Sequence, residues 1–440
     1  MGIYLNPGNE RFEDAVSSEI YVDKTELIKY TNRVLKTEQK YICVSRPRRF
    51  GKSMAANMLA AYYGRNADSR KLFENLKIEK NASFMEHLNQ YNVIFLNMQD
   101  FFSRTHDVTK MKMLLEKCLL RDLLRAYPDV DYLDKTDLIG VLQDIYAEFR
   151  IRFIFIIDEW DCIFRENKDG SEAHKMYLDF LRNLLKDRSY VALAYMTGIL
   201  PIKKYGTHSA LNMFDEFSMT NPKQLAEFVG FTESEVKGLC NRYGMDFEET
   251  RRWYDGYHFE NVEHVYSPRS VVSAMLSRSF DNYWNQTETF EALRDYIVLN
   301  YAGLKDTVIE LLAGKHKKIE TGSFSNDMTT FSTADDVLTL LIHLGYLGYD
   351  FSSKEVFIPN SEIESEFVTA IQSAGWDTVI NAIKKSDNLL KETWNKSAEG
   401  AIAQMKDKKY IKALEEYKGN MLLVGVNYDK ESKKHQCVIE

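Results

Sequence analysis

The stretch from Val44 to Met54 reads VSRPRRFGKSM and contains Gly51-Lys52-Ser53, the closing triplet of a phosphate-binding loop. In the usual loop, a first glycine and four further residues precede that triplet, and the backbone N–H groups surround the phosphates. Arg46 stands where that first glycine belongs. Two interpretations follow: a phosphate site that lacks one glycine, or a chance Gly-Lys-Ser on a basic surface loop.

The segments that flank the loop favour the phosphate site. Residues 41–45 are a short apolar run typical of a buried parallel strand. Residues 52–63 are rich in helix formers and are followed by Gly64. A strand, a loop and a helix in this order direct backbone N–H groups and the positive end of the helix dipole at a bound phosphate.

Further apolar runs alternate with helical patterns along the first half of the chain. They cover residues 93–98, 152–161, 190–198 and, with a weaker pattern, 214–220. Strands that alternate with helices predict an α/β fold, a P-loop NTPase parallel sheet with helices on both faces. Ligands of such sheets bind at the carboxyl ends of the strands, where both the loop and the end of 152–161 are expected to lie.

The run at 152–161 carries the second group of chemically important residues. Its strand pattern leads into Asp158 and Glu159. A magnesium ion bound to ATP would be held by Asp158 and the Ser53 hydroxyl, Glu159 would orient or deprotonate the attacking water, and Lys52 would bind phosphate. Thr197, at the end of the next strand, either places its hydroxyl near the γ-phosphate or belongs to a turn.

Composition limits the class of protein. The 440 residues are 45% hydrophobic, enough for roughly two to three domains with full cores. Acidic residues outnumber basic ones by 65 to 57, which weighs against a uniformly basic nucleic-acid surface. The five cysteines are widely spaced without a CxxC pair, and the sequence shows no secretory signal or membrane span. We therefore expect a soluble, cytoplasmic protein without a membrane partner.

Residues 221–330 are predicted to be mainly helical, and Thr232 and Glu235 have the spacing of a capping box at a helix start. The aromatic residues of the WYDGYHF stretch at 253–259 form either a recognition surface or the core of a small helical domain. Residues 334–360 follow a helix, strand, turn, strand pattern typical of a winged helix. Such a wing either contacts DNA or serves packing alone.

Several motifs together resemble a bacterial and archaeal family of AAA-ATPase-like proteins that usually carry a PD-(D/E)xK nuclease-like domain at the C-terminus. The motifs are YVDKT (21–25), RPRRFGKS (46–53), IIDEWD (156–161), MTGIL (196–200), GFTESEV (230–236), WYDGYHF (253–259) and VYSPRSV (265–271). The resemblance implies that Arg46 in place of glycine is a family feature, and that ATP and Mg²⁺ are the cofactors. The expected nucleotide-binding residues are Arg46, Pro47, Arg48, Arg49, Phe50, Gly51, Lys52, Ser53 and Met54.

The three arginines of the loop repel one another unless anions lie close, and guanidinium groups suit phosphate oxygens. Either all three bind phosphate, or one meets phosphate while the others pair with carboxylates or solvent, and the second interpretation is favoured. Nucleic-acid binding by this cluster is the least favoured, because the loop backbone already serves ATP.

The C-terminal segment resembles only the end of the family's nuclease-like domain. In the family, metal-binding carboxylates on strands precede the position of Trp394-Asn395, but here helical sequence stands there. Glu362, Glu364 and Glu366 are expected to face solvent at a helix start. The Glu-x-Lys string at 416–418 ends a predicted helix and the one at 431–433 lies in a turn, so neither lies on a buried strand. Asp377, Asp387 and Glu392 fall in a helical stretch and do not emerge from an apolar strand. We therefore expect a small, truncated α/β remnant without nuclease activity.

The predicted domains are an ATPase domain at 1–220, a helical and winged-helix-like region at 221–360 and the remnant at 361–440. Two functions stay open: Mg²⁺-dependent ATP hydrolysis that drives a conformational change, or a nucleotide-gated switch with very slow turnover that binds DNA or protein. The sequence identifies neither an arginine finger nor an oligomeric state.

Overall fold

The computed structural model describes residues 2–65, 67–166, 170–202, 204–205, 208–209, 211–259, 262–284, 290–299, 301, 303–326, 328, 331–373, 424–429 and 434–439. Its contacts divide the chain into two compact units, Met1–Ala370 and Ile371–Glu440. The first unit contains the phosphate loop and the large sheet.

A five-stranded parallel sheet in the order β2-β3-β4-β1-β7 forms the centre of the first unit. The strands are β1 (Tyr41–Ser45), β2 (Asn92–Asn97), β3 (Phe153–Asp158), β4 (Val191–Gly198) and β7 (Asp215–Phe217). The three central strands, β1, β3 and β4, are buried along their whole length. Helices cover both faces of the sheet, so both sides of each central strand are buried. This is why the strands are continuous apolar runs in the sequence. The predicted fold class is confirmed, and the weak run at 214–220 contains β7.

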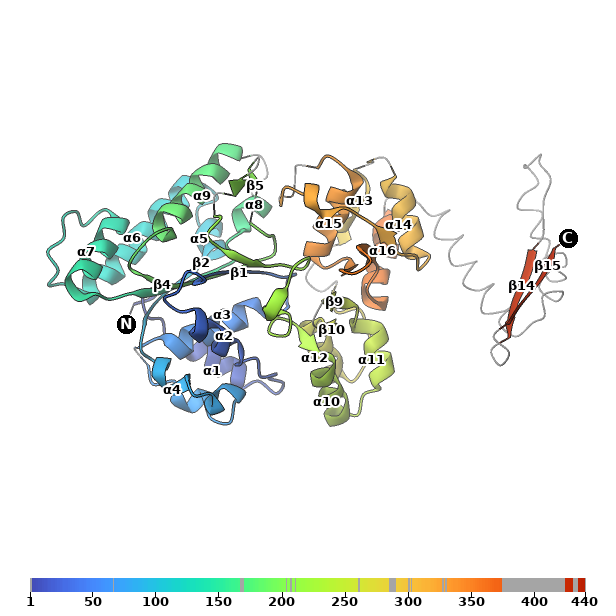
Figure 1. Ribbon diagram of the computed structural model, residues 1–440, viewed down its shortest axis with the longest axis horizontal. Helices are drawn as coiled ribbons and strands as arrows, with labels where there is room; N and C mark the ends of the chain where they lie inside the picture. The colour runs from blue at the N-terminus through green and yellow to red at the C-terminus, as the bar shows by residue number, and fades with distance from the viewer. Residues whose placement is uncertain are drawn as a thin grey trace. The chain divides into compact units, whose positions relative to one another are not determined.

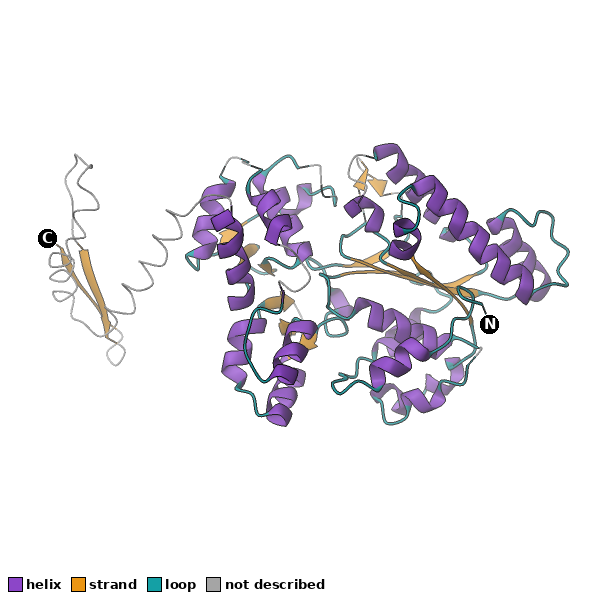
Figure 2. Cartoon of the chain, turned by 180° about the vertical axis from the view of Figure 1, so that it is seen from behind, coloured by secondary structure: helices purple, strands orange, loops and turns teal. Residues whose placement is uncertain are grey.

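The helices form two layers, with α1 to α4 on one face of the sheet and α5 to α9 on the other (Figure 1). The view from behind shows the strands between the same two layers (Figure 2). The first layer contains α1 (Glu10–Val16), α2 (Leu27–Val34), α3 (Lys52–Tyr63) and α4 (Phe84–His87). The second layer contains α5 (Met98–Ser103), α6 (Val108–Ala126), α7 (Leu138–Phe149), α8 (Cys162–Glu166) and α9 (Ser171–Leu185). None of the helices in these described ranges, or in those below, is long and apolar enough to cross a membrane.

The chain after the large sheet forms helices around two small antiparallel sheets, β8-β10-β9 and β11-β13-β12. The strands are β8 (Phe231–Thr232), β9 (Tyr257–Phe259), β10 (Val262–Tyr266), β11 (Lys317–Lys318), β12 (Gly348–Asp350) and β13 (Glu355–Phe357). The helices are α10 (Glu233–Tyr243), α11 (Phe247–Tyr254), α12 (Pro268–Ser277), α13 (Phe290–Ile297), α14 (Leu304–Leu312), α15 (Ala334–Leu344) and α16 (Ser361–Ser373). The capping box of Thr232 and Glu235 at the start of α10 is confirmed.

The aromatic residues of the WYDGYHF stretch pack inside the protein. Tyr254, Tyr257 and Phe259 are buried, and Trp253 is half-buried against the same core. The packing interpretation of this stretch is therefore confirmed for these three side chains. The predicted helix, strand, turn, strand order is found in α15, β12 and β13, and every residue of α15 from Asp336 to His343 is buried.

Two glutamates of α16 contradict the expectation that they face solvent. Glu362 is completely buried and Glu366 is 2% exposed, whereas Glu364 is exposed as predicted. Glu362 Oε1 accepts hydrogen bonds from the backbone N–H groups of Tyr283 (2.8 Å) and Trp284 (2.9 Å), and the Ser270 hydroxyl donates to its Oε2 (2.8 Å). The donors that satisfy this buried carboxyl come from segments about 80 to 90 residues away in the chain, so the helix pattern alone did not reveal them.

Replacing Glu362 by glutamine should remove a pH-dependent loss of stability. The pKa of Glu362 is raised from 4.5 to about 7, mainly because the side chain is buried. The hydrogen bonds to the carboxylate oppose this shift but do not cancel it. The folded state therefore holds this proton more tightly than the unfolded state, and stability falls as the pH rises from about 4.5 through about 7. The full difference is about 3 kcal/mol.

Urea unfolding of the wild type and Glu362→Gln at about pH 5 and about pH 8 measures this difference. Glu364→Gln is the matched control, because it removes a carboxylate from the exposed side of the same helix. A Glu362→Gln variant that loses as much stability between the two pH values as the wild type would contradict the prediction.

The second unit is described only by a hairpin of β14 (Val424–Asp429) and β15 (Lys434–Ile439). The two strands pair antiparallel, with Val424 opposite Ile439 and Asp429 opposite Lys434. Both strands lie within residues 361–440, the segment expected to form a small α/β remnant. Asp377, Asp387, Glu392, Trp394-Asn395 and both Glu-x-Lys strings lie outside the described residues.

Candidate nucleotide-binding site

A cavity of about 530 Å³ opens at the start of α3. The phosphate loop from Arg48 to Ala55 lines one part of it, together with Glu159 from the end of β3. The N-terminal segment around residues 18–24, residues 228–231 and one side of α12 line most of the remainder. Segments from three distant parts of the chain thus meet at the carboxyl end of the parallel sheet, where ligands of such sheets bind.

The loop turns sharply just before α3. Gly51 has a φ of 91° and directly precedes α3, and Arg49 has a φ of 67°. Lys52 Nζ donates to the backbone oxygens of Arg46 (3.0 Å) and Pro47 (2.8 Å). Its ammonium therefore lies inside the loop, where burial lowers its pKa and the charges of Glu159 and neighbouring aspartates oppose that shift.

Asp158 and Thr197 lie side by side at the ends of β3 and β4. The Thr197 hydroxyl donates a short hydrogen bond to Asp158 Oδ1, which also accepts from the backbone N–H of Glu159 (3.1 Å). Among the described residues, no donor is bonded to Asp158 Oδ2. The Thr197 hydroxyl thus restrains the Asp158 carboxylate, and its predicted place near the γ-phosphate stays a prediction.

The donor set fits a magnesium ion. Ser53 is exposed in the first turn of α3, and Asp158 is a buried carboxylate at the strand end that faces the same edge of the sheet. Mg²⁺ takes oxygen ligands and keeps several waters when it is bound with substrate phosphates, so one hydroxyl and one carboxylate suffice from the protein. No group of three or more His, Cys, Asp or Glu suited to a metal occurs in the described part of the chain.

Glu159 lines the cavity directly after β3 in a left-handed backbone conformation, with a φ of 54°. Such a conformation costs a non-glycine residue about 1 kcal/mol or more and is common at functional sites. Arg165 Nη2 donates to Glu159 Oε2, and Arg165 Nε lies 3.3 Å from Asp161 Oδ2. Burial raises the pKa of Glu159, while the positive charges of Lys52 and Arg165 oppose the shift.

The structure places Arg46 away from the nucleotide cavity, against the expectation that it binds nucleotide. Its side chain is completely buried, and Nη1 donates to the backbone oxygens of Ser45 (2.9 Å) and Phe217 (2.8 Å). The guanidinium lies 5.0 Å from the centre of the Phe259 ring. Burial lowers the pKa of Arg46 to about 10. Phe217 and Phe259 are remote in sequence, so the loop motif alone could not predict this direction.

Two more loop residues contact the chain after the large sheet. The ring of Phe50 packs edge-on against Tyr257, with 5.1 Å between ring centres. Gly345, directly after α15, lies so close to Pro47 that a methyl group on it would come within 2.8 Å of the proline ring. The Tyr257 hydroxyl in turn donates to the backbone oxygen of Gly345 (2.6 Å). Pro47 is absent from the cavity lining, whereas Phe50 lies in it beside Arg48, Arg49 and Met54.

The sequence interpretation missed several residues of the cavity. Arg269 at the start of α12 lines it, and so do the apolar residues Ile20, Val22 and Leu276. Arg269 belongs to the VYSPRSV motif, so the motif gave a signal, but nothing in its spacing showed that α12 approaches the loop. A cationic side chain and apolar surface are the complement of a nucleotide with its phosphates and its base.

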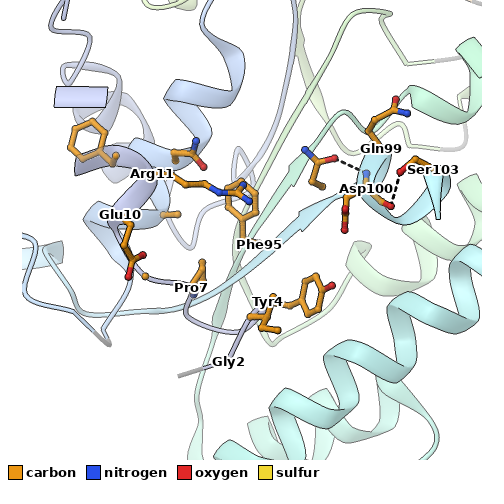
Figure 3. Close-up of a pocket in the computed structure, with 15 residues that line it drawn as sticks. Gly2, Tyr4, Pro7, Glu10, Arg11, Phe95, Gln99, Asp100 and Ser103 are labelled. Carbon is orange, nitrogen blue, oxygen red and sulfur yellow. Dashed lines mark hydrogen bonds between the residues drawn. The ribbon is translucent and has the colours of Figure 1, made fainter. Parts of the chain in front are cut away.

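A second cavity of about 580 Å³ lies beside the end of β2 and contains none of the predicted site residues. Figure 3 shows Arg11 reaching over Phe95, with Gln99 and Asp100 of α5 on the other side. The Arg11 guanidinium carbon is 6.0 Å from the centre of the Phe95 ring. This cavity is therefore separate from the phosphate loop.

Residues 8–207 match the protein family described as "Predicted AAA-ATPase". This region is therefore similar to that family. The matched range of the domain includes every predicted catalytic, loop and metal-binding residue, from Arg46 to Thr197. The match does not reach the small sheets or the C-terminal hairpin.

A curated relative of this chain is an uncharacterised protein in the vnfD 5′ region of Azotobacter chroococcum mcd 1. It is 26% identical over 290 residues, which are 63% of this chain and 52% of that protein. The chain thus spans about half the length of this relative.

Two solved structures are similar at low identity. Cdc6p from Pyrobaculum aerophilum is 11% identical, covers 82% of this chain and 98% of its own, and has a TM-score of 0.29. The ORC1 protein of Aeropyrum pernix in complex with DNA is 13% identical, with a coverage of 83% and 97% and a TM-score of 0.30. TM-scores this low do not establish a shared function.

Proposed function

We propose that the cavity binds ATP with Mg²⁺ and hydrolyses it, and that the AAA-ATPase-like domain transmits the nucleotide state to the helical region behind it. The observation that carries the proposal is the meeting of the loop, Lys52 and Glu159 in one cavity, with Asp158 as the last residue of β3 directly before Glu159. Phosphoryl transfer depends on such positive and negative groups, and their proximity supports the proposal.

Each residue has a distinct role in this proposal. Lys52 exchanges its two backbone acceptors for phosphate oxygens, and the N–H groups at the start of α3 bind the same phosphates. Mg²⁺, when bound by Ser53 and Asp158, would neutralise charge on the phosphates. Glu159 accepts the proton of the attacking water. Arg48, Arg49 and Arg269 supply further positive charge around the phosphates.

The apolar part of the cavity suits the base of the nucleotide. Ile20 and Val22 from the N-terminal segment face Phe231 and Leu276 from the region after the large sheet within the same cavity lining. A base enclosed between these two segments would hold them together. Lys24 already joins them, because its Nζ donates to the backbone oxygen of Glu227 (2.7 Å) and pairs with Glu235 of α10.

The unusual loop residues provide the proposed coupling. Arg46, Pro47 and Phe50 contact Phe259, Gly345 and Tyr257, respectively. If the loop changes conformation when phosphate binds, these contacts carry the change to the β9 hairpin and to the end of α15. Packed interfaces of this kind transmit small shifts, because they do not deform continuously.

The alternative function is a nucleotide-gated switch that binds DNA or protein and turns over very slowly. The same coupling contacts would serve it. The burial of α15 counts against DNA reading by that helix, since a helix that enters the major groove must present its side chains. We favour hydrolysis, and we also propose that residues 361–440 do not cleave DNA.

Phosphate release from ATP by the purified protein, with and without plasmid and single-stranded DNA, separates the two functions. We expect Mg²⁺-dependent turnover that DNA does not alter, and none in excess EDTA. Turnover seen only with DNA would contradict our preference and support the switch. The same DNA samples on a gel report cleavage, and cleavage that requires Mg²⁺ or Mn²⁺ would contradict the proposed lack of nuclease activity.

A further inference from the structure

Arg165 is a buried cation for which nucleotide binding gives no role. It lies on α8 with a side chain 6% exposed, and it does not line the nucleotide cavity. Its guanidinium instead reaches two carboxylates, those of Glu159 and Asp161. A direct phosphate contact is therefore not the arrangement that the structure shows.

The two carboxylates differ in how firmly they are held. Asp161 is completely buried, and its Oδ2 accepts hydrogen bonds from the backbone N–H groups of Ile199 (3.0 Å) and Leu200 (2.8 Å). Glu159 lies at the cavity wall, and its carboxylate accepts through Oε2 from Arg165. Arg165 thus connects a carboxylate fixed to the end of β4 with the one that faces the nucleotide.

Stability alone is a poor reason for this arrangement. A buried ion pair loses most of its attraction to the cost of removing both charges from water, and apolar replacements are often neutral or stabilising. Precise placement is a better reason, because a misplacement of about 1 Å in a reacting group can lower a rate by about 10²-fold. The glutamate side chain is flexible, and a charge-assisted hydrogen bond from the planar guanidinium of Arg165 restrains its position.

We propose that Arg165 is a positioning residue that holds Glu159 Oε2 so that Oε1 faces the attacking water; this inference rests on the proposed ATP hydrolysis. The water oxygen forms a bond with the γ-phosphorus, and the bond from that phosphorus to the bridging oxygen breaks as ADP leaves with the electron pair. Glu159 Oε1 takes the proton of the water. Asp161 fixes Arg165 from the other side.

The test compares Arg165→Ala, Arg165→Gln and Arg165→Lys with the wild type in ATP turnover and in ATP affinity by calorimetry. We expect kcat to fall by about 10²-fold in the first two variants, with little change in ATP affinity or KM. Lysine keeps the positive charge but lacks the planar guanidinium that reaches both carboxylates. Arg165→Lys should therefore recover only part of the rate. Arg182→Ala is the matched control, because Arg182 is 52% exposed on α9 and should leave kcat unchanged.

A second measurement distinguishes positioning from a general structural role. In single turnovers of a Glu159→Gln background, Arg165→Ala should cause little further loss, because its effect passes through Glu159. Independent, multiplicative losses would overturn the inference, as would an unchanged or raised kcat in Arg165→Ala and Arg165→Gln, or a fall in ATP affinity as large as the fall in kcat. A wild-type protein without ATP turnover would overturn the proposed function and this inference together.

Discussion

Replacing Glu159 by glutamine should leave ATP binding intact and lower turnover by about 10²-fold to 10⁴-fold. Glutamine has nearly the same shape as glutamate, so the loop and Lys52 still bind phosphates. It cannot accept the proton of the attacking water, and that proton transfer is the step that Glu159 is proposed to carry out. The affinity for ATP should therefore stay near that of the wild type.

Calorimetric titration with ATP and an assay of phosphate release check both halves of this prediction. Glu166→Gln is the matched control, since Glu166 is exposed on the same helix as Arg165 and its Oε1 accepts from Gln99 (2.6 Å) outside the nucleotide cavity. Full turnover in Glu159→Gln would show that another group activates the water.

Replacing Arg46 by alanine should destabilise the protein by about 3 kcal/mol. The change empties the space of a completely buried side chain and removes its hydrogen bond to Phe217 and its contact with the Phe259 ring. ATP affinity should change little, because the guanidinium lies away from the cavity.

Arg48→Ala should have the opposite effects on ATP binding and on stability, so it is the matched comparison for Arg46→Ala. Arg48 lines the cavity, so its loss should weaken ATP binding and leave stability nearly unchanged. Urea unfolding and calorimetric titration of the two variants measure these effects. If Arg46→Ala abolished ATP binding without a loss of stability, the original expectation of a phosphate contact would be correct.

The sheet and the strand-end residues could be predicted from the sequence, because their signals are local. The run before Gly51 and the run before Asp158 are continuous and apolar, as buried parallel strands require. In an open parallel sheet the ends of such strands meet at one edge. The positions of Lys52, Asp158 and Glu159 therefore followed from the pattern alone.

The rest of the site depends on contacts between residues far apart in the chain. Arg46 turns toward Phe217 and Phe259, and Arg269 approaches the loop on a helix more than 200 residues later. Glu362 likewise was expected to face solvent. Its hydrogen-bond donors, the backbone N–H groups of Tyr283 and Trp284, lie far away in the sequence, and no local pattern indicates them. Periodicity predicts elements, but it does not predict which elements meet.

The central claim, that ATP binds at this loop, is tested most directly by calorimetric titration of Lys52→Ala with ATP and Mg²⁺. Lys110→Ala, which removes an exposed lysine of α6, is the control. We predict saturable binding by the wild type and the control, and none by Lys52→Ala. Binding of ATP by Lys52→Ala with the affinity of the wild type would contradict the account.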